Sequence, residues 1–568
     1  MPTDLLAKLD EQQRQAALSL IGPTCIIAGA GTGKTRTITH RIAYGIAKGY
    51  YSANRVLALT YTNKAAAELR SRLRALGVGT VSAKTFHSAA LAQLEFFWPQ
   101  FAGAAAPAIL ESKAKVLGKL AEERKLRLDV SAIRDLAAEI EWRKFSMLSI
   151  EQYAATNRKP PAGISAPLML ELLSAYEDAK VAANQIDWED VLILCLGMLR
   201  AEPRALAHVQ QQYRFFTVDE YQDISPLQQA LLDTWLGDRS DLCVVGDPNQ
   251  TIYSFTGASS RFLHDFQSRY EAANVIELTQ NYRSTQQIVT FANRLRTGNQ
   301  ASLTAAGPVG LAPRIMNFDS ATDEAAYLAH QVSTAIASGT KPSQIAILYR
   351  INGQSEALER ALANAGVEYQ LRGGVRFFAR PEITQAMQTI RAELASGAAA
   401  TARDSAAGVG KTTGHLVTEI ARGLGWNVEP PASGGAARDK WESLNALLGI
   451  LDEVPATISL EDFYNELVER QRSQHDPVRA AVTLSTIHAA KGLEWDYVYV
   501  AGVAEGYLPI SYAKTEAEIA EELRLLYVAI TRAKRHLLLS WSAADHQSGS
   551  QQRPRQASRF LQLLQPKH

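Results

Sequence analysis

Cysteine is scarce in this chain. Its 568 residues include three cysteines, Cys25, Cys195 and Cys243, and no two of them lie close together in sequence. This spacing excludes a zinc site of the CxxC type and an iron–sulfur run, so we expect no structural metal site. Cys25 and Cys243 fall inside apolar runs, which predicts buried thiols. So few cysteines suit a reducing cytosol.

An excess of charge of one sign is also missing. The chain has 59 Lys and Arg against 58 Asp and Glu, a net charge of +1. Such a balance excludes a whole-protein attraction for polyanions, so any nucleic-acid surface must be a local basic path. No apolar run reaches the roughly 18 residues of a membrane-spanning helix. The N-terminal segment lacks the apolar core of a signal peptide. We therefore expect a cytoplasmic protein without membrane contacts.

Short β-branched runs followed by helical stretches recur in two regions. Hydrophobic residues make up 46% of the chain and charged residues 21%, as in globular proteins, and the length predicts about three to five domains. The runs are "CIIA", "VLALT", "FFTV", "LCVV" and "VIEL" in the first half, and "IAILY", "VTLST", "YVYVA" and "HLLLS" later. They predict an α/β fold with two parallel sheets covered by helices on both faces. Two mainly helical blocks, about 96–203 and 406–476, interrupt them, and no fixed-period repeat is present.

The stretch "CIIAGAGTGKTRTITHRI" has the order strand, glycine-rich turn, helix. It fits the phosphate-loop pattern with Ala28 in first place and Gly33, Lys34 and Thr35 at its end. Glycines let backbone N–H groups wrap the phosphates of ATP, Lys34 reaches the β- and γ-phosphates, and the Thr35 hydroxyl binds Mg²⁺. The remaining nucleotide-binding positions of the loop are Gly29, Ala30, Gly31 and Thr32.

Two acidic residues follow the apolar run "FFTV" in "FFTVDEYQD". Ligands bind at the carboxyl ends of parallel strands, which is where Asp219 and Glu220 are expected. Asp219 is predicted to hold Mg²⁺, and Glu220 to orient and deprotonate the attacking water. Gln250, after the run "LCVV", is a candidate contact to the γ-phosphate.

A second glycine-rich stretch, "GVGKTTG" at 408–414, resembles a phosphate loop only superficially. Ser405 stands where the pattern requires Gly or Ala, no β-branched strand precedes the loop, and no acidic pair follows a strand in that block. We therefore predict a single ATP site, with Lys411 solvated or in minor contact with duplex phosphate.

Together these stretches resemble the motifs of superfamily 1 helicases of the UvrD/Rep/PcrA family. In chain order they are "LDEQQRQAA", "AGAGTGKTR", "ALTYTNKAAAELRSRL", "KTFHS", "VDEYQD", "VVGDPNQTIYSFTGA", "QNYRST", "STIHAAKGLEWD" and "LLYVAITRAKRHL". The resemblance implies two RecA-like motor domains, each with a mainly helical insertion. The implied boundaries are 1–95 and 207–282 for domain 1A, 96–206 for insertion 1B, 283–395 and 479–568 for domain 2A, and 396–478 for insertion 2B.

The resemblance also assigns roles around the nucleotide. Gln13 is the implied adenine reader, and Arg36 packs near the adenine. Tyr282 stacks on the base, and Glu494 touches the ribose. The implied arginine fingers, which place cations against the charge that develops during phosphoryl transfer, are Arg283 and Arg532.

A single-stranded DNA track is implied as well, built from aromatic stacking and backbone contacts. Phe86 and Tyr253 have an open alternative as core aromatics, and His87 has one as an ordinary capped histidine. The matched DNA candidates are Tyr61, Thr62, Asn63, Phe86, His87, Tyr253, Phe255, Arg350 and Asn352.

Three departures from the family pattern stand out. Thr256 replaces an arginine in "FTGA", Leu523 replaces one in "EELR", and insertion 2B is short. The combination looks most like the divergent second UvrD-type helicase of actinobacteria. Longer members of that group carry a tetracysteine module, which three cysteines cannot form.

The expected activity is 3′-to-5′ movement on single-stranded DNA and unwinding of 3′-tailed duplexes, driven by ATP and Mg²⁺, in DNA repair or replication maintenance, with repair proteins as possible partners. The alternatives are a translocase that displaces proteins from DNA with weak or partner-dependent unwinding, and an ATP-driven scaffold.

Overall fold

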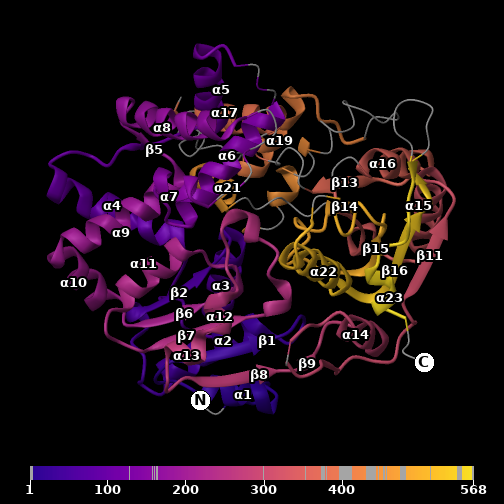
Figure 1. The fold of residues 1–568 in the computed structure, drawn as a ribbon, viewed down its shortest axis with the longest axis horizontal. Coiled ribbons are helices and arrows are strands. Elements are labelled where there is room, and N and C mark those ends of the chain that lie inside the picture. The colour runs from indigo at the N-terminus through magenta and orange to yellow at the C-terminus, as the bar shows by residue number, and fades with distance from the viewer. Residues whose placement is uncertain are drawn as a thin grey trace, which may run out of the picture. The chain divides into compact units, whose positions relative to one another are not determined.

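A computed structural model describes residues 4–565 apart from 127, 129, 157, 159, 161–163, 299, 352–353, 373–377, 379, 396–411, 430–442, 445–446, 452–453, 456, 474–480, 512 and 546–552. The chain forms two compact units. Unit 1 comprises Met1–Gly310 and Thr515–Thr531, and unit 2 comprises Leu311–Lys514 and Arg532–His568. Each unit contains one six-stranded sheet (Figure 1).

The sheet of unit 1 has the strand order β3-β2-β6-β7-β1-β8, and its strand pairs are parallel. The five apolar runs of the first half supply five of these strands, as predicted. The strands are β1 (Thr24–Ala28), β2 (Val56–Thr60), β3 (Ser82–Thr85), β6 (Phe215–Val218), β7 (Leu242–Gly246) and β8 (Asn274–Leu278).

Alternate residues of these strands enter two different cores. Leu57 and Leu59 of β2 pack with α4 (Phe86–Ala102), α9 (Trp188–Ala201), α10 (Pro203–Gln212) and α11 (Pro226–Leu236). Val56 and Ala58 pack on the opposite face with α1 (Glu11–Leu18), α2 (Lys34–Ala47) and α3 (Asn63–Ala75). Side chains point to alternate faces of a strand, so the sheet is covered on both faces, as its apolar composition predicts.

A separate helical core belongs to the predicted insertion 1B. It includes Leu117, Leu136, Ile140 and Leu172, all buried. Its helices are α5 (Lys113–Glu123), α6 (Val130–Phe145), α7 (Ile150–Ala154) and α8 (Ala166–Ala182).

Unit 2 repeats the parallel arrangement with the order β11-β16-β15-β12-β14-β13. Ile345, Ile347 and Tyr349 of the central strand β12 pack with α15 (Ala321–Ala337) and α16 (Ser355–Asn364). The other strands are β11 (Arg314–Phe318), β13 (Tyr369–Arg372), β14 (Val482–Thr486), β15 (Trp495–Val500) and β16 (Ala533–Ser542). The α/β prediction is therefore confirmed in both units.

A small helical core also lies in unit 2. Its members include Ile383 and Ile390 from α17 (Pro381–Ala395), Val417 from α19 (Thr413–Gly423), and Phe463 from α21 (Leu460–Ser473). The end of "GVGKTTG" begins α19, with Thr412 as its N-cap, whereas 408–411, including Lys411, lie outside the described residues.

Helix α22 (Glu516–Ile530) groups with unit 1, although the chain on both sides of it belongs to unit 2. The two units are defined as the parts of the chain that are each compact in space. The four-part division into 1A, 1B, 2A and 2B stays a prediction.

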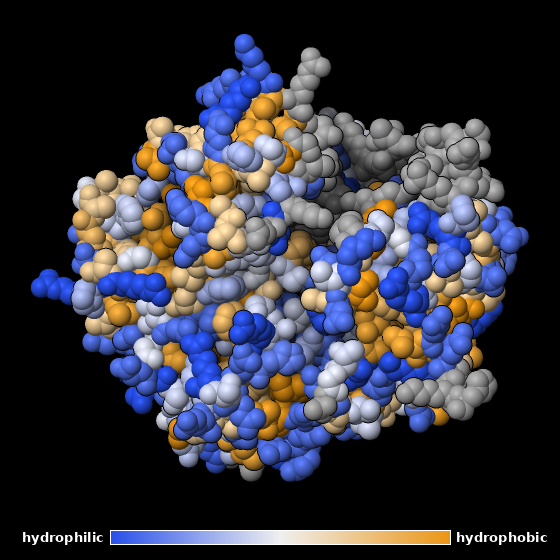
Figure 2. Space-filling view, in the orientation of Figure 1, coloured by the Kyte–Doolittle hydropathy of each residue, from blue (hydrophilic) through white to orange (hydrophobic). Residues whose placement is uncertain are grey.

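The surface shown in Figure 2 intersperses hydrophilic and hydrophobic residues. All three thiols are buried, as predicted for Cys25 and Cys243. Within the described ranges no helix combines the length and apolarity needed to cross a bilayer.

Candidate nucleotide site and nucleic-acid interface

The loop "GAGTGKT" joins the end of β1 to the start of α2 in unit 1. Gly31 and Gly33 have φ values of +72° and +81°, in the left-handed region that favours glycine. A Cβ at Gly31 would stand 2.5 Å from Nδ2 of Asn281, and one at Gly33 would stand 2.7 Å from Nε2 of Gln13. Backbone conformation therefore favours glycine at both positions, and at Gly31 the Arg283 Cβ atom, 2.8 Å from the added Cβ, also leaves no space. Lys34 Nζ donates to the Ala28 carbonyl at 3.2 Å.

Gln13 supports the loop from α1. Its side chain is 1% exposed, and its Nε2 donates to the Thr32 carbonyl oxygen at 2.9 Å. Thr32 is fixed a second time because its hydroxyl donates to Gly29 O at 2.9 Å. The predicted adenine reader is thus also a buried support of the phosphate loop.

Asn281 is a second buried support, and the sequence analysis missed it. Its Nδ2 donates to Ala30 O at 2.7 Å, while its Oδ1 accepts from the backbone N–H groups of Arg283, at 2.9 Å, and Ser284, at 2.8 Å. One amide therefore ties the phosphate loop to the predicted arginine finger. Its place in "QNYRST", two residues before the arginine, was the available signal.

The acidic pair follows β6 as predicted. Asp219 is 7% exposed, and its Oδ1 accepts from the Glu220 backbone N–H at 2.9 Å. Burial and the Glu220 carboxylate raise the pKa of Asp219 to about 7, and Lys34 opposes this rise. Glu220 has φ = +52°, an unfavourable conformation for a residue other than glycine. Strain of this kind is concentrated at functional sites.

Gln222 links the acidic pair to the loop that holds Gln250. Its Nε2 donates to Glu220 Oε2 at 2.5 Å, and its Oε1 accepts from the Asp247 backbone N–H at 3.0 Å. Gln250 in turn donates from Nε2 to Asp247 Oδ2 at 2.7 Å. The predicted base and the predicted γ-phosphate contact are thus joined through two buried side chains. Gln222 was also missed, although it lies within "VDEYQD".

The donor set fits a magnesium ion. The Thr35 hydroxyl and the Asp219 carboxylate are hard oxygen ligands, and a buried carboxylate gains from a nearby cation. Mg²⁺ keeps several waters and takes few ligands from protein. The described residues contain no cluster of three or more His, Cys, Asp or Glu side chains that could hold a metal ion.

Other predicted nucleotide contacts lie on the same unit. The Tyr282 ring is 45% exposed, and its hydroxyl donates to Asp10 Oδ2 at 2.5 Å. Arg36 Nη2 donates to the Lys8 carbonyl. Arg283 Nη1 donates to Thr531 O at 3.1 Å.

Two predicted contacts lie in unit 2. Arg532 is 2% exposed, and its Nη1 donates to Leu493 O at 3.2 Å. Glu494 forms an ion pair with Lys534 at 2.7 Å. Their contacts to the nucleotide stay a prediction.

Three aromatic side chains form a row on unit 1. The Tyr61 and Tyr253 rings are stacked with centroids 5.4 Å apart, and Phe255 meets Tyr253 edge-on at 6.1 Å. Tyr61 is 37% exposed and Phe255 54% exposed. Exposed rings of this kind can stack on bases without reading sequence.

Phe86 does not share this exposure. Its ring is 3% exposed and stacks on Trp235 with centroids 6.0 Å apart, inside the core of unit 1. Of the two open alternatives, the structure favours a core aromatic, because a buried ring cannot stack on a base.

His87 is half-buried and packs edge-on against Phe145 and Trp188, each at 6.1 Å. Burial, reinforced by Lys113, lowers the pKa of His87 to about 4, so the ring is neutral near pH 7. Trp188 is 48% exposed and was missed by sequence analysis, which placed it inside a helical block. The sequence does show that Trp188 directly follows Asp187. Asp187 is the N-cap of α9, so Trp188 is the first residue of this helix.

The remaining predicted DNA residues occupy loop and cap positions. Thr62 caps α3, with its hydroxyl accepting from Ala65 N at 3.1 Å, and Asn63 Oδ1 accepts from the Ser88 hydroxyl at 3.4 Å. Arg350 follows β12 in unit 2, and its backbone N–H donates to Gln354. Asn352 lies outside the described residues.

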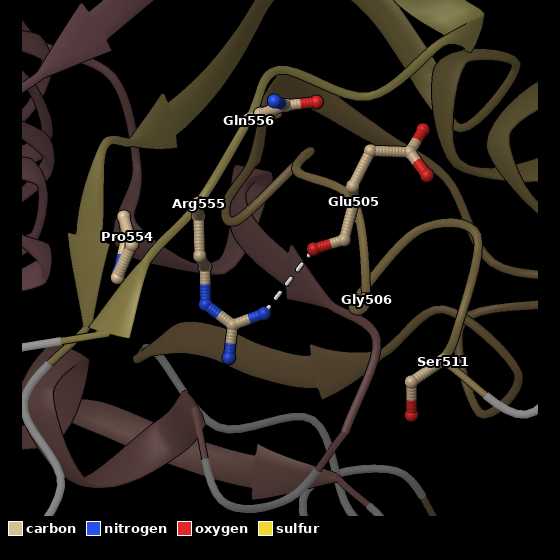
Figure 3. Close-up of a pocket in the computed structure, with 6 residues that line it drawn as sticks. All are labelled: Glu505, Gly506, Ser511, Pro554, Arg555 and Gln556. Carbon is tan, nitrogen blue, oxygen red and sulfur yellow. Dashed lines mark hydrogen bonds between the residues drawn. The ribbon is translucent and has the colours of Figure 1, made fainter.

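A cavity of about 450 Å³ in unit 2 contains none of the predicted residues. The Arg555 side chain crosses it and donates to the Glu505 carbonyl oxygen at 3.2 Å (Figure 3). Its guanidinium also lies 3.6 Å from the Tyr507 ring centroid. These contacts fasten the C-terminal segment to the loop after β15, which is a structural role.

Comparison with known proteins agrees with this arrangement. Residues 9–271 match the model of the UvrD/REP helicase N-terminal domain, and residues 276–396 and 399–544 match that of the UvrD-like helicase C-terminal domain. The chain belongs to the UvrD/REP helicase family.

Several relatives in this family align over nearly the whole chain. The ATP-dependent DNA helicase UvrD2 of Mycobacterium tuberculosis is 44% identical over 591 residues, covering 99% of this chain and 82% of the relative. UvrD1 of the same organism is 30% identical, covering 99% and 86%. PcrA of Bacillus subtilis is 27% identical, covering 94% and 83%. The predicted resemblance is thus confirmed, and these similarities extend across both sheets.

Proposed function

We propose that this chain is a DNA-stimulated ATPase that moves 3′ to 5′ along single-stranded DNA and unwinds 3′-tailed duplexes. The observation that carries the proposal is the pairing of two features in unit 1. The acidic pair and Gln250 are joined through hydrogen bonds of Gln222 and Asp247, and the phosphate loop lies on the same unit. The row of Tyr61, Tyr253 and Phe255, in which the Tyr61 and Phe255 rings are exposed, also lies on this unit. Relatives named as ATP-dependent DNA helicases support the substrate.

In the proposed mechanism the loop amides and Lys34 bind the phosphates of ATP. Glu220, held by Gln222, orients water for attack on the γ-phosphate and accepts its proton. Arg283 and Arg532 place positive charge against the developing negative charge. Thr35 and Asp219 would hold the Mg²⁺ ion, which neutralises phosphate charge when bound.

The DNA path is proposed to use stacking on Tyr61, Tyr253, Phe255 and the newly found Trp188. Thr62, Asn63, Arg350 and Asn352 would contact the phosphate backbone. His87 would contribute packing and hydrogen bonding but no charge, because its ring is neutral near pH 7. We place the activity in the cytosol, in DNA repair or replication maintenance.

The deciding experiment measures ATP hydrolysis with and without single-stranded DNA, together with strand displacement on 3′-tailed and 5′-tailed duplexes. The proposal predicts strong DNA stimulation and displacement from the 3′-tailed substrate. Displacement from the 5′-tailed duplex alone would overturn the proposed direction, and hydrolysis indifferent to DNA would overturn the proposed coupling.

A second candidate is a translocase that strips proteins from DNA and unwinds weakly without a partner. The shortness of the predicted insertion 2B, 396–478, favours it, because the family resemblance implies that 2B touches duplex DNA. Removal of a tightly bound protein, measured beside strand separation on one substrate, distinguishes the two. Processive unwinding of a long duplex by the chain alone would exclude this candidate.

A further inference from the structure

One face of helix α22 carries three side chains that each bind a different element of unit 1. Glu521, Arg524 and Tyr527 are spaced three residues apart, so they share one helix face. We call these three residues the α22 row. Because the helix rises 1.5 Å per residue, the row spans about 9 Å.

The first member binds the turn that carries Tyr253 and the exposed ring of Phe255. The Glu521 carboxylate accepts from the Ser254 backbone N–H at 3.1 Å and also from the Ser254 hydroxyl. Ser254 lies between Tyr253 and Phe255 in sequence and begins the short 3-10 helix η5 (Ser254–Thr256). A displacement of either ring therefore changes the position of the group that Glu521 holds.

The second member binds the loop of the proposed γ-phosphate contact. Arg524 Nε donates to the Thr251 carbonyl oxygen at 2.8 Å, one residue after Gln250. Burial lowers the pKa of Arg524, and Glu521 opposes this effect. The first two members thus also interact electrostatically with each other.

The third member reaches the phosphate loop. Tyr527 is completely buried, and its hydroxyl accepts from Arg296 Nη1 at 3.2 Å. The Ala30 backbone is also within hydrogen-bonding reach of this hydroxyl. Arg296 Nη1 lies close to the loop as well, 3.0 Å from where a Cβ of Gly29 would stand. The α22 row therefore contacts the turn of Tyr253 and Phe255 at one end, through Glu521, and the phosphate loop at the other, through Tyr527.

We propose that the α22 row transmits occupancy of the DNA track to the phosphate loop, so that DNA binding accelerates ATP hydrolysis. The inference rests on the proposed function and adds its internal coupling. A helix is stiff over two turns, so a shift at Ser254 moves Arg524 and Tyr527 with it. The arginine that the family pattern places in this turn is Thr256 in this chain. The Glu521–Ser254 pair links this turn directly to α22, which makes both residues positioning residues.

A purely structural role predicts something different. Ser254 is exposed, Glu521 is half-buried, and the bonds between them lie at the surface, where a hydrogen bond adds about 1 kcal/mol or less to stability. Loss of this pair should therefore change coupling more than folding.

The test is a double-mutant cycle with Glu521→Ala and Ser254→Ala. The quantity measured is the ratio of the ATPase rate at saturating oligo(dT) to the rate without DNA. We expect each single variant to lower this ratio about fivefold or more, and the double variant to be no worse than the more severe single variant. Tyr527→Phe, which removes only the hydroxyl, should lower it in the same direction.

Glu518→Gln is the matched control, because Glu518 lies one turn earlier on α22 and its carboxylate caps the helix at Thr515. This variant should keep the wild-type ratio. Three outcomes would overturn this inference and leave the proposed function standing. The ratio could be unchanged in both single variants, or the effects of the two substitutions could multiply in the double variant. The ATPase rates with and without DNA could also fall equally, together with a loss of folding. A wild-type ATPase that ignores oligo(dT) would overturn the proposed function, and the inference with it.

Discussion

The side-chain amide of Asn281 donates a 2.7 Å hydrogen bond to the Ala30 carbonyl oxygen, and its own carbonyl accepts from the backbone N–H of Arg283 at 2.9 Å. The amide is 2% exposed. A single buried side chain thus sets the distance between the phosphate loop and the residue expected to stabilise the transition state.

Replacing Asn281 by Asp should lower kcat/KM for ATP by about tenfold or more, because a carboxylate cannot donate to Ala30 and leaves that carbonyl unpaired at a cost of about 1–3 kcal/mol. Steady-state ATPase assays measure this. Asn293→Asp is the matched control, since Asn293 similarly spans the Leu303 backbone with bonds of 2.8 and 3.0 Å. An equal loss in the control would argue against a specific role of the Asn281 clamp.

The two lysines in loop-like sequences should behave differently. Lys34→Ala should abolish ATP hydrolysis because it removes the cation of the phosphate loop, whereas Lys411→Ala should leave hydrolysis intact. Nucleotide binding and turnover measured on both variants test the prediction of a single site. A turnover defect in Lys411→Ala would contradict it.

Glu220→Gln should bind ATP normally and fail to turn it over, since the amide cannot accept the proton of the attacking water. Normal DNA-stimulated hydrolysis in this variant would show that the base is misassigned.

The φ of +52° at Glu220 leads to a separate prediction about stability. The free energy of unfolding of Glu220→Gly, measured by denaturant titration, should exceed that of Glu220→Ala by about 1 kcal/mol, because only glycine relieves the left-handed strain. Both variants lack the carboxylate, so the comparison isolates the backbone. Equal stability of the pair would mean that the conformation carries no strain.

Replacing Trp188 by Ala should raise the single-stranded DNA concentration at half-maximal ATPase, by roughly fivefold to a hundredfold, since stacking on one base contributes about 1–3 kcal/mol. Tyr50→Ala, at a ring that is 53% exposed outside the motifs, is the control. If both variants shift equally, Trp188 has no specific contact to DNA.

Acid should destabilise the protein partly through His87. Its pKa is lowered to about 4 in the folded chain against about 6.5 when unfolded. The unfolded state therefore binds more protons between these values, and stability falls as the pH drops through this window. His87→Phe, which keeps an aromatic ring beside Phe145 and Trp188, should reduce the fall in unfolding free energy between pH 6.5 and 5. An unchanged slope would mean that His87 is not protonated on unfolding.

The features that could be predicted from the sequence are those that depend on residues close together in the chain. The strands and the phosphate loop were predicted because β-branched runs and the glycine spacing are local signals. Asn281 and Gln222 were missed because their hydrogen bonds reach partners distant in sequence, Ala30 for Asn281 and Asp247 for Gln222. Phe86 shows the reverse, since its motif position resembles a DNA contact while Trp235, far along the chain, covers its ring.

The assignment of residues 515–531 to unit 1 has a consequence for dissecting the protein. The polypeptide passes from one unit to the other three times, after Gly310, Lys514 and Thr531. No single cut can therefore release either unit whole, and a fragment ending near residue 310 would lack Glu521, Arg524 and Tyr527. Expressed alone, such a fragment would keep the phosphate loop but lose the hydrogen bonds of α22 with Ser254, Thr251 and Arg296. Instability of the isolated half would then reflect its missing helix and not a failure of its sheet to fold.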